Sequence, residues 1–299
     1  MCSKGFVFVN KLLKRRHASI ILDKIPSIPY NKSNRSKEGA SMKRTLITPE
    51  LYSIPEVFHP LLAGKAVYDS SCSTEARVYY IPSEGCFLKS APKGRLQREK
   101  DLTAFMSTRF PAPKVLAYLS DERDWLLTSA VEGEDCTHPD HLADPKRLCD
   151  LLAETLHTIH GLDTAGCPVK DHPAGYFATA EENYRKGEWD LSYCDGAFGT
   201  PEEAFAHLQA NRYLLQKDTL LHGDYCLPNV MLKNWQVSGI IDLGNGGVGD
   251  RHVDLYWGAW TLRFNLKTDA YRERFFDAYG RGLIDQERLL LVSAAECFG

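Results

Sequence analysis

The sequence feature that most constrains this chain is a set of polar residues that follows two short apolar segments. The first segment ends at His222-Gly223-Asp224, and Asn229 follows five residues after Asp224. The second segment, 239–241, ends at Asp242, thirteen residues after Asn229. Apolar segments this short are typical of buried strands, and a β-hairpin fits between Asn229 and Asp242. Such a hairpin would return Asp242 to the side of Asn229, so we expect three oxygen-bearing side chains at one place.

The types and spacing of these residues indicate a particular chemistry. His-x-Asp with an Asn five residues after the Asp is the spacing of a kinase catalytic loop. A carboxylate at Asp224 can orient a substrate hydroxyl and accept its proton. The amide oxygen of Asn229 and the carboxylate of Asp242 are the hard oxygen ligands that Mg²⁺ prefers. The pattern therefore predicts a magnesium-dependent kinase that transfers the terminal phosphoryl group of a nucleotide to a hydroxyl.

Residues earlier in the chain predict a matching nucleotide site. Lys89 ends a predicted strand, and Glu99 lies ten residues later on a predicted helix. A strand lysine paired with a helix glutamate is how kinases hold the α- and β-phosphates. The loop 69–75, which contains Ser73 and Thr74, carries hydroxyls but no glycine fingerprint. We expect this loop to cover the phosphates through its backbone N–H groups and hydroxyls.

The order of predicted strands and helices indicates an α+β fold with two lobes. Short strands bounded by turn residues are predicted at 66–68, 77–81, 86–89, 115–119 and 125–128. Apolar residues at helical spacing predict helices at 96–110, 145–162, 201–213 and 270–281. We expect a small antiparallel-sheet N-lobe over 42–130 and a mainly helical C-lobe over 131–299. Ligand sites often lie at such a junction.

Charge is distributed unevenly along the chain. Residues 1–41 hold nine Lys and Arg against two acidic residues, a net charge of +7, so the remaining residues carry −10 of the overall −3. An acidic body argues against a nucleic-acid partner and favours cationic small molecules. We interpret 1–41 as a basic, disordered extension. We read this extension as an upstream translated leader, with Met42 as the effective start of the protein. The alternative is that it is a targeting segment.

Cysteine usage and hydropathy bear on the cellular setting. The nine cysteines are odd in number and include no C-x-x-C pair, which predicts reduced thiols in a cytoplasmic protein. No apolar run approaches the roughly 20 residues that a membrane helix needs, so we expect a soluble protein without a membrane partner. His157 and His160 lie three residues apart on a predicted helix, and we interpret them as core residues rather than as metal ligands.

The motifs together resemble the aminoglycoside 3′-phosphotransferases, the kanamycin kinases of antibiotic-resistant bacteria. The residues that carry the resemblance are 222–229, 238–251, Asp254, 98–101 and 111–115. The resemblance extends from about Lys43 to the end of the chain. It implies a protein-kinase-like two-lobed fold. It also implies transfer of the γ-phosphoryl group of ATP or GTP to a hydroxyl, the 3′-hydroxyl, of drugs such as kanamycin and neomycin.

The resemblance also implies individual roles. Asp224 would be the catalytic base, and Asn229 and Asp242 would bind Mg²⁺. The residues implied to bind the nucleotide are Lys89, Glu99, Phe87, Ser73, Thr74, Ser129 and Val131. Within this set Phe87 would stack on the base, and the backbone of Ser129 and Val131 would bond to it.

The resemblance places the acceptor site against carboxylates, because aminoglycosides are polycations. A loop over 190–203 offers Asp195 and Glu202, and Glu296 lies close to the chain end. Relatives tend to end with an acidic pair before two aromatic residues. This chain ends with one acidic residue in Ala295-Glu296-Cys297-Phe298-Gly299, a departure that bears on which antibiotics are accepted.

Two other functions stay open at this stage. One is a kinase of the same fold that acts on a metabolite alcohol such as choline or a sugar. The other is a pseudokinase that binds nucleotide without catalysis. A pseudokinase commonly lacks the strand lysine or one aspartate, whereas Lys89, Asp224, Asn229 and Asp242 are all present.

Overall fold

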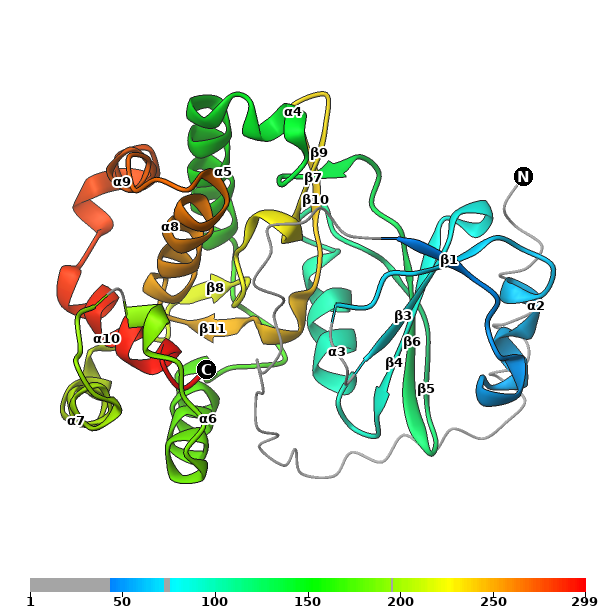
Figure 1. Ribbon diagram of the computed structural model, residues 1–299, viewed down its shortest axis with the longest axis horizontal. Coiled ribbons are helices and arrows are strands. Elements are labelled where there is room, and N and C mark those ends of the chain that lie inside the picture. The colour runs from blue at the N-terminus through cyan, green and yellow to red at the C-terminus, as the bar shows by residue number, and fades with distance from the viewer. Residues whose placement is uncertain (1–43, 73–75, 195) are drawn as a thin grey trace.

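The computed structural model describes residues 44–72, 76–194 and 196–299. The predicted extension over 1–41 lies outside these residues, as do Ser73, Thr74 and Asp195. Figure 1 shows a sheet on one side of the molecule and a group of helices on the other. The predicted α+β architecture is therefore confirmed.

The first region is built on one antiparallel sheet of six strands in the order β1-β2-β3-β4-β6-β5. Its strands are β1 (Thr45–Ile47), β2 (Val67–Asp69), β3 (Arg77–Ile81), β4 (Cys86–Pro92), β5 (Val115–Ser120) and β6 (Arg123–Ser129). Along β4, Cys86 and Leu88 are buried while Phe87 and Lys89 are half-buried. Because side chains alternate between the two faces of a strand, Phe87 and Lys89 lie on one face.

The buried face of the sheet packs on residues from the start of the region. The short helix α2 (His59–Leu62) contributes Leu61 and Leu62 to a cluster with Leu88 and Leu127 of the sheet. Burying such side chains fully contributes about 1.5–3 kcal/mol each. Because this core covers one face of the sheet, the opposite face, which carries Lys89, is directed toward the rest of the chain.

A single longer helix, α3 (Gln97–Met106), lies between the sheet and the second region (Figure 1). The buried carboxylate of Asp124 accepts a hydrogen bond from the N–H of Leu96 at 2.8 Å, just before the helix begins. A negative charge there is favourable because helix N-termini carry unsatisfied N–H groups. The helix predicted over 96–110 is shorter in the structure: α3 ends at Met106, and residues 107–110 form a turn before Pro111.

The second region is mainly helical. Its helices are α4 (Pro139–Leu142), α5 (Pro145–His160), α6 (His172–Lys186), α7 (Pro201–Asn211), α8 (His252–Leu266), α9 (Arg272–Gly280) and α10 (Gln286–Glu296). Four begin behind an Asp or Thr side-chain cap: Asp144, Asp171, Thr200 and Asp285. Such caps each contribute on the order of 1 kcal/mol. The helices share one large core that includes Leu152, Leu156 and Trp257.

Short strands inside the helical region carry the polar motif. β8 (Thr219–Leu221) pairs with β11 (Gly247–Gly249), and β9 (Val230–Lys233) pairs with β10 (Gln236–Ile240) and β7 (Glu134–Asp135). The β9–β10 pair is the hairpin predicted between Asn229 and Asp242. Its two-residue turn, Asn234 and Trp235, has φ of 52° and 59°, as tight hairpin turns require.

Two properties concern only the part of the chain that the structure describes. There, no helix combines the length and apolar character needed to cross a membrane. No disulfide joins the eight cysteines among these residues.

Candidate active site

The loop that carries Asp224 begins where β8 ends. Leu220 and Leu221 are buried, and the chain turns at Gly223, which has φ of 80°. A Cβ atom at Gly223 would lie 2.0 Å from the carbonyl oxygen of Asn245. Only glycine fits both this conformation and this close approach. Asp224 follows directly and is 2% exposed.

A buried carboxylate from α8 fixes this turn. The backbone N–H groups of His222 and Gly223 each donate to Asp254 at 2.8 Å, one to each carboxylate oxygen. Burial opposes the charge on Asp254, but hydrogen bonds from His160 and the His222 backbone lower its pKa below the ordinary value. A carboxylate that accepts several N–H bonds stays ionised, so Asp254 is a permanent anchor for the loop.

The ring of His222 ties the same loop to the end of the hairpin. Its Nδ1 accepts a hydrogen bond from the backbone N–H of Asp224 at 3.3 Å. Because a backbone N–H can only donate, the ring proton resides on Nε2. That atom donates to the carbonyl of Ile241 at 3.0 Å, one residue before Asp242. His222 thus links the two halves of the polar motif.

Asn229 closes the loop around Asp224. Its Nδ2 donates to the backbone oxygen of Asp224 at 2.8 Å and to the carboxylate at 3.2 Å. The thiol of Cys226 donates to the other carboxylate oxygen at 3.3 Å. Since Nδ2 is committed to Asp224, the amide oxygen of Asn229 faces the opposite way and can accept a cation or a donor. The carbonyl of Asn229 accepts from the N–H of Ile241 at 2.9 Å.

Asp242 leaves the hairpin in the left-handed conformation, with φ 59° and ψ 58°. This conformation is costly for a residue other than glycine and is often found at functional sites. Its side chain is 48% exposed. The Asp242 carboxylate therefore projects from a buried loop toward solvent.

Lys89 joins this carboxylate to helix α3. Its Nζ lies 2.7 Å from Oε2 of Glu99 and 3.4 Å from Oδ1 of Asp242. Burial alone would lower the pKa of Lys89, but the carboxylates of Asp242 and Glu99 outweigh it and raise the pKa well above the ordinary value. Lys89 is therefore a fixed positive charge between the two acidic groups. The predicted pairing of strand lysine and helix glutamate is present in the structure.

The described members of the remaining set expected to bind nucleotide lie in strands β4 and β6 or just after β6. Phe87 shares its face with Lys89 and stacks on Tyr80, with ring centroids 4.5 Å apart. The backbone N–H of Ser129 donates to the carbonyl of Lys114 at 2.9 Å, so it is already used within the sheet. Val131 follows the last strand and is half-buried.

The acidic residues expected at the acceptor site have different surroundings. Glu202 is exposed in the first turn of α7. Glu296 is only 2% exposed, and its Oε1 accepts from the hydroxyl of Tyr176 at 2.9 Å and from Trp257 at 2.8 Å. Glu296 therefore ties α10 to α6 and α8 inside the helical region, a contact that the sequence did not reveal.

Asp254 and His160 are further residues whose part in the site the sequence analysis missed. Asp254 was noted only as a member of the motif, and His160 was interpreted as a core residue. His160 is indeed buried, and its Nε2 lies 3.1 Å from Asp254 while its Nδ1 bonds to the hydroxyl of Tyr279 at 2.8 Å. The sequence carried a signal for this pair. His160 lies on a leucine-rich helix, and Asp254 is an acidic residue in an otherwise apolar helix.

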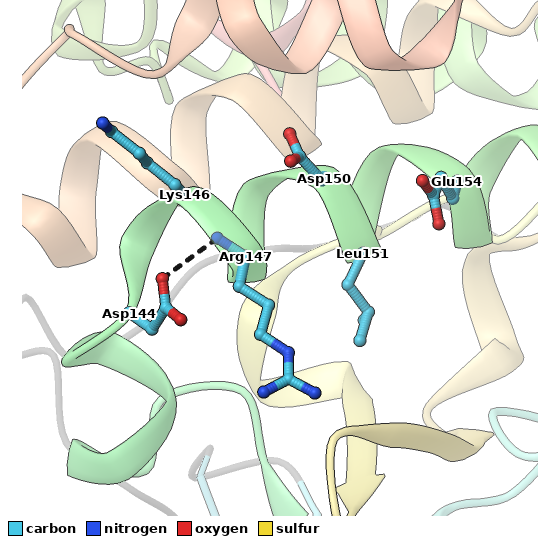
Figure 2. A pocket seen from close by; sticks show the side chains of 6 residues that line it. All are labelled: Asp144, Lys146, Arg147, Asp150, Leu151 and Glu154. Atoms are coloured by element: carbon cyan, nitrogen blue, oxygen red, sulfur yellow. Dashed lines mark hydrogen bonds between the residues drawn. The ribbon is translucent and has the colours of Figure 1, made fainter.

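A surface hollow on the first half of α5 lies outside this constellation (Figure 2). It is lined by Asp144, Lys146, Arg147, Asp150, Leu151 and Glu154. Arg147 already stacks on Trp235 at 4.4 Å, and Asp150 pairs with Arg274 at 2.7 Å. Among the residues that the structure describes, no group of three or more His, Cys, Asp or Glu side chains is arranged to hold a metal. The hydrogen-bonded polar groups around Asp224 and Lys89 make that site the strongest candidate.

Comparisons with known proteins agree with this geometry. A family model described as "Phosphotransferase enzyme family" matches residues 73–290. The chain is 46% identical over 248 residues to a "Probable aminoglycoside 3′-phosphotransferase" of Lactococcus lactis subsp. lactis (strain IL1403), which covers 82% of this chain and 95% of that relative. It is 31% identical over 209 residues to an aminoglycoside 3′-phosphotransferase of Niallia circulans, covering 68% and 79%.

A solved structure shares the fold. The aminoglycoside phosphotransferase APH(3″)-Id from Streptomyces rimosus, in complex with ADP and streptomycin, superimposes with a TM-score of 0.67 at 23% identity. The match covers 84% of this chain and 98% of that one. The predicted two-part, kinase-like fold is thereby confirmed.

Proposed function

The chain belongs to the aminoglycoside 3′-phosphotransferase family of phosphotransferase enzymes, and from this premise we propose what its site does. It transfers the γ-phosphoryl group of ATP to the 3′-hydroxyl of aminoglycoside antibiotics such as kanamycin and neomycin, and thereby confers resistance. The added phosphate removes positive charge from a drug that must meet RNA phosphates.

One observation carries this proposal further than any other. Two groups of polar residues, distant in sequence, form one connected set: Glu99–Lys89–Asp242 on one side and Asp224–Asn229 on the other. Ile241 joins them through its backbone, which bonds to Asn229 and His222. This set contains the parts that phosphoryl transfer needs. They are a base, a lysine that binds phosphate, and two side-chain oxygens that can ligate a metal ion.

Asp224 is the proposed base. Its carboxylate is held by Asn229 and Cys226, so its orientation is fixed before substrate arrives. It orients the acceptor hydroxyl and takes its proton as the new P–O bond forms. Catalysis here is mainly positioning and charge stabilisation rather than covalent chemistry.

The donor set fits Mg²⁺. The amide oxygen of Asn229 faces away from Asp224, and the Asp242 carboxylate is half-exposed. Magnesium is typically held by one or two such oxygen ligands together with substrate phosphates and water. When bound, the ion would neutralise the charge on the β- and γ-phosphates. Asn229 and Asp242 are the residues that we propose to hold it.

The nucleotide lies against the sheet in this proposal. Lys89, oriented by Glu99, binds the α- and β-phosphates, and the ring of Phe87 stacks on the base. Val131 and Ser129 bond to the edge of the base. Ser129 uses its carbonyl for this, because its N–H already donates to Lys114. Ser73 and Thr74 cover the phosphates. Apart from Val131 at the junction, the proposed nucleotide contacts thus belong to an N-lobe over 42–130.

The aminoglycoside binds to a C-lobe over 131–299. Carboxylates suit a polycation, and we propose Asp195 and the exposed Glu202 as direct contacts. Glu296 acts from inside the core by holding the last helix through Tyr176 and Trp257. We further propose a cytoplasmic enzyme, since ATP is available there and reduced thiols are the rule in that compartment.

Mass spectrometry of the acceptor tests this function. Purified protein, Mg²⁺ and ATP are incubated with kanamycin, neomycin, a 3′-deoxy aminoglycoside and choline in separate reactions. We expect one added phosphate on kanamycin and neomycin, located at the 3′ position by phosphorus NMR, and none on the 3′-deoxy compound. Phosphorylation of choline alone would contradict the proposal and favour a metabolite kinase.

A further inference from the structure

Arg98 connects the two regions of the molecule at a point next to the active site. It precedes Glu99 on α3, the helix that lies between the sheet and the helical region (Figure 1). Its guanidinium donates to the carbonyl of Gly246 at 2.8 Å and approaches the carbonyl of Asn245 at 3.4 Å. Both acceptors belong to the second region, so one side chain of the sheet region holds a backbone segment of the other.

The segment that Arg98 holds is the one that follows Asp242. After Asp242 the chain makes a single 3₁₀ turn, Leu243–Asn245, and then reaches Gly246. Carbonyls at the end of such a turn lack partners within the turn, and a positive charge is favourable beside them. Arg98 therefore binds the exit of the loop that carries the proposed metal ligand.

The other side of this segment packs directly on the loop that carries Asp224. A Cβ atom at Gly246 would lie 2.6 Å from the carbonyl of Leu221, and one at Gly223 would lie 2.0 Å from the carbonyl of Asn245. A single stretch of backbone therefore lies between α3 and the catalytic loop. A displacement of the segment would reach Asp224 as well as Asp242.

The next residue of α3 makes the second half of this connection. Glu99 binds Lys89 at 2.7 Å, and a Cβ atom at Gly244 would lie 3.3 Å from the Cβ of Glu99. Adjacent side chains of one helix therefore contact the metal-binding loop and the phosphate-binding lysine. The position of α3 sets how Lys89 and Asp242 face each other.

We propose that Arg98 is a positioning residue that fixes the sheet region against the loop of Asp242 and so aligns nucleotide phosphates with the proposed metal ligands. This inference rests on the proposed phosphotransferase function. Without Arg98 the charge-assisted bonds to Asn245 and Gly246 are lost. Helix α3 then moves Glu99 away from the loop, and the side chain of Lys89 on β4 follows through its ion pair with Glu99. ATP affinity and turnover therefore both decrease, while the acceptor site in the other region is unchanged.

Steady-state kinetics of Arg98→Met and Arg98→Lys test this role. Methionine keeps much of the length but has no donor, whereas lysine keeps the charge and can bind one carbonyl. For Arg98→Met we expect about a tenfold higher KM for ATP and about a tenfold lower kcat, since bonds from charged donors are the strong ones. KM for kanamycin should stay within about twofold, and Arg98→Lys should recover part of both losses.

The control is Gln97→Met on the neighbouring exposed position, whose side chain bonds only within α3, to Asp101. It should match the wild type. A variant that merely unfolds lowers kcat without changing KM for ATP, and thermal denaturation of each variant identifies that case. Wild-type-like ATP kinetics in Arg98→Met, or an equal loss in Gln97→Met, would overturn the inference. Failure of the wild type to phosphorylate kanamycin would instead reject the proposed function.

Discussion

The catalytic loop and the strand that carries Lys89 meet at one site but are held in different ways. Asp224 and Asn229 are 2% and 7% exposed, and their loop bonds to buried partners in α5 and α8 through Asp254. Lys89 and Asp242 have side chains 23% and 48% exposed and share one contact of 3.4 Å. The acceptor side of the reaction is therefore built into the fold, whereas the nucleotide side is set by a few charges.

This difference indicates which steps each region controls. Buried polar networks whose members are all satisfied hold a fixed geometry, which suits a base that must meet a hydroxyl in one orientation. Half-exposed charges can adjust when phosphates and a cation arrive. We therefore expect changes around the catalytic loop to affect turnover and folding, and changes around Lys89 to affect ATP binding, with a loss of turnover as well where the loop of Asp242 is displaced.

Replacing the proposed base gives the largest expected effect. Asp224→Asn keeps the shape of the side chain but removes the proton acceptor. General acid–base catalysis contributes about 10²–10⁴-fold, so kcat should fall by that factor while ATP affinity, measured by calorimetry, changes little. Turnover close to that of the wild type would remove Asp224 from its role.

Removing the anchor of the loop should cost stability. Asp254→Ala leaves the buried N–H groups of His222 and Gly223 without their acceptor. Breaking a buried charged contact typically costs about 3–5 kcal/mol, which urea denaturation can measure. Lys89→Met should cost less because the side chains of Lys89 and Asp242 are 23% and 48% exposed, so water can solvate the groups that remain. Equal losses in the two variants would break the contrast between the regions.

A smaller effect is expected from the partner of Lys89. Glu99→Gln removes a charge that orients Lys89 but keeps a hydrogen-bonding oxygen. We expect KM for ATP to rise by about tenfold, consistent with the value of a charge-assisted bond, with little change in KM for kanamycin. A larger change in KM for kanamycin than in KM for ATP would contradict the assignment of Glu99 to the nucleotide site.

The smallest effect concerns pH. Burial lowers the pKa of His160 below its usual 6.5, while Asp254, Tyr279, Arg251 and His157 face it. Below pH 6.5 the unfolded chain binds a proton there that the folded chain does not. Stability from this residue is therefore complete above pH 6.5 and falls as pH drops toward the folded pKa.

His160→Gln isolates that contribution. Between pH 7.5 and 5.5 the wild type should lose more Tm than the variant, because only the wild type has the buried imidazole whose pKa is lowered by folding. Thermal denaturation at both values measures it. Identical pH profiles would show that His160 does not titrate in this window.

Local patterns in the sequence predicted much of this structure. The strand Arg77–Ile81 agrees with its prediction to the residue, and the hairpin between Asn229 and Asp242 forms as expected. The spacing of His222, Asp224 and Asn229 was informative because one short loop holds all three. These features depend on neighbours along the chain, which periodicity and turn residues encode directly.

Contacts between distant residues were beyond the reach of such patterns. Asp254 binds backbone groups about thirty residues away, and Arg98 binds Gly246 across 148 positions. A carboxylate and a guanidinium in helical sequence look the same whether they face solvent or a buried carbonyl. The burial of Glu296 likewise depends on Tyr176 and Trp257 from two other helices.

A crystal structure with Mg²⁺ and a non-hydrolysable ATP analogue tests the shared site most directly. The expected result is a metal ion ligated by the amide oxygen of Asn229 and a carboxylate oxygen of Asp242, at about 2.0–2.1 Å. Lys89 should reach the phosphates. A metal bound to other residues, or phosphates remote from both side chains, would contradict the proposed reaction.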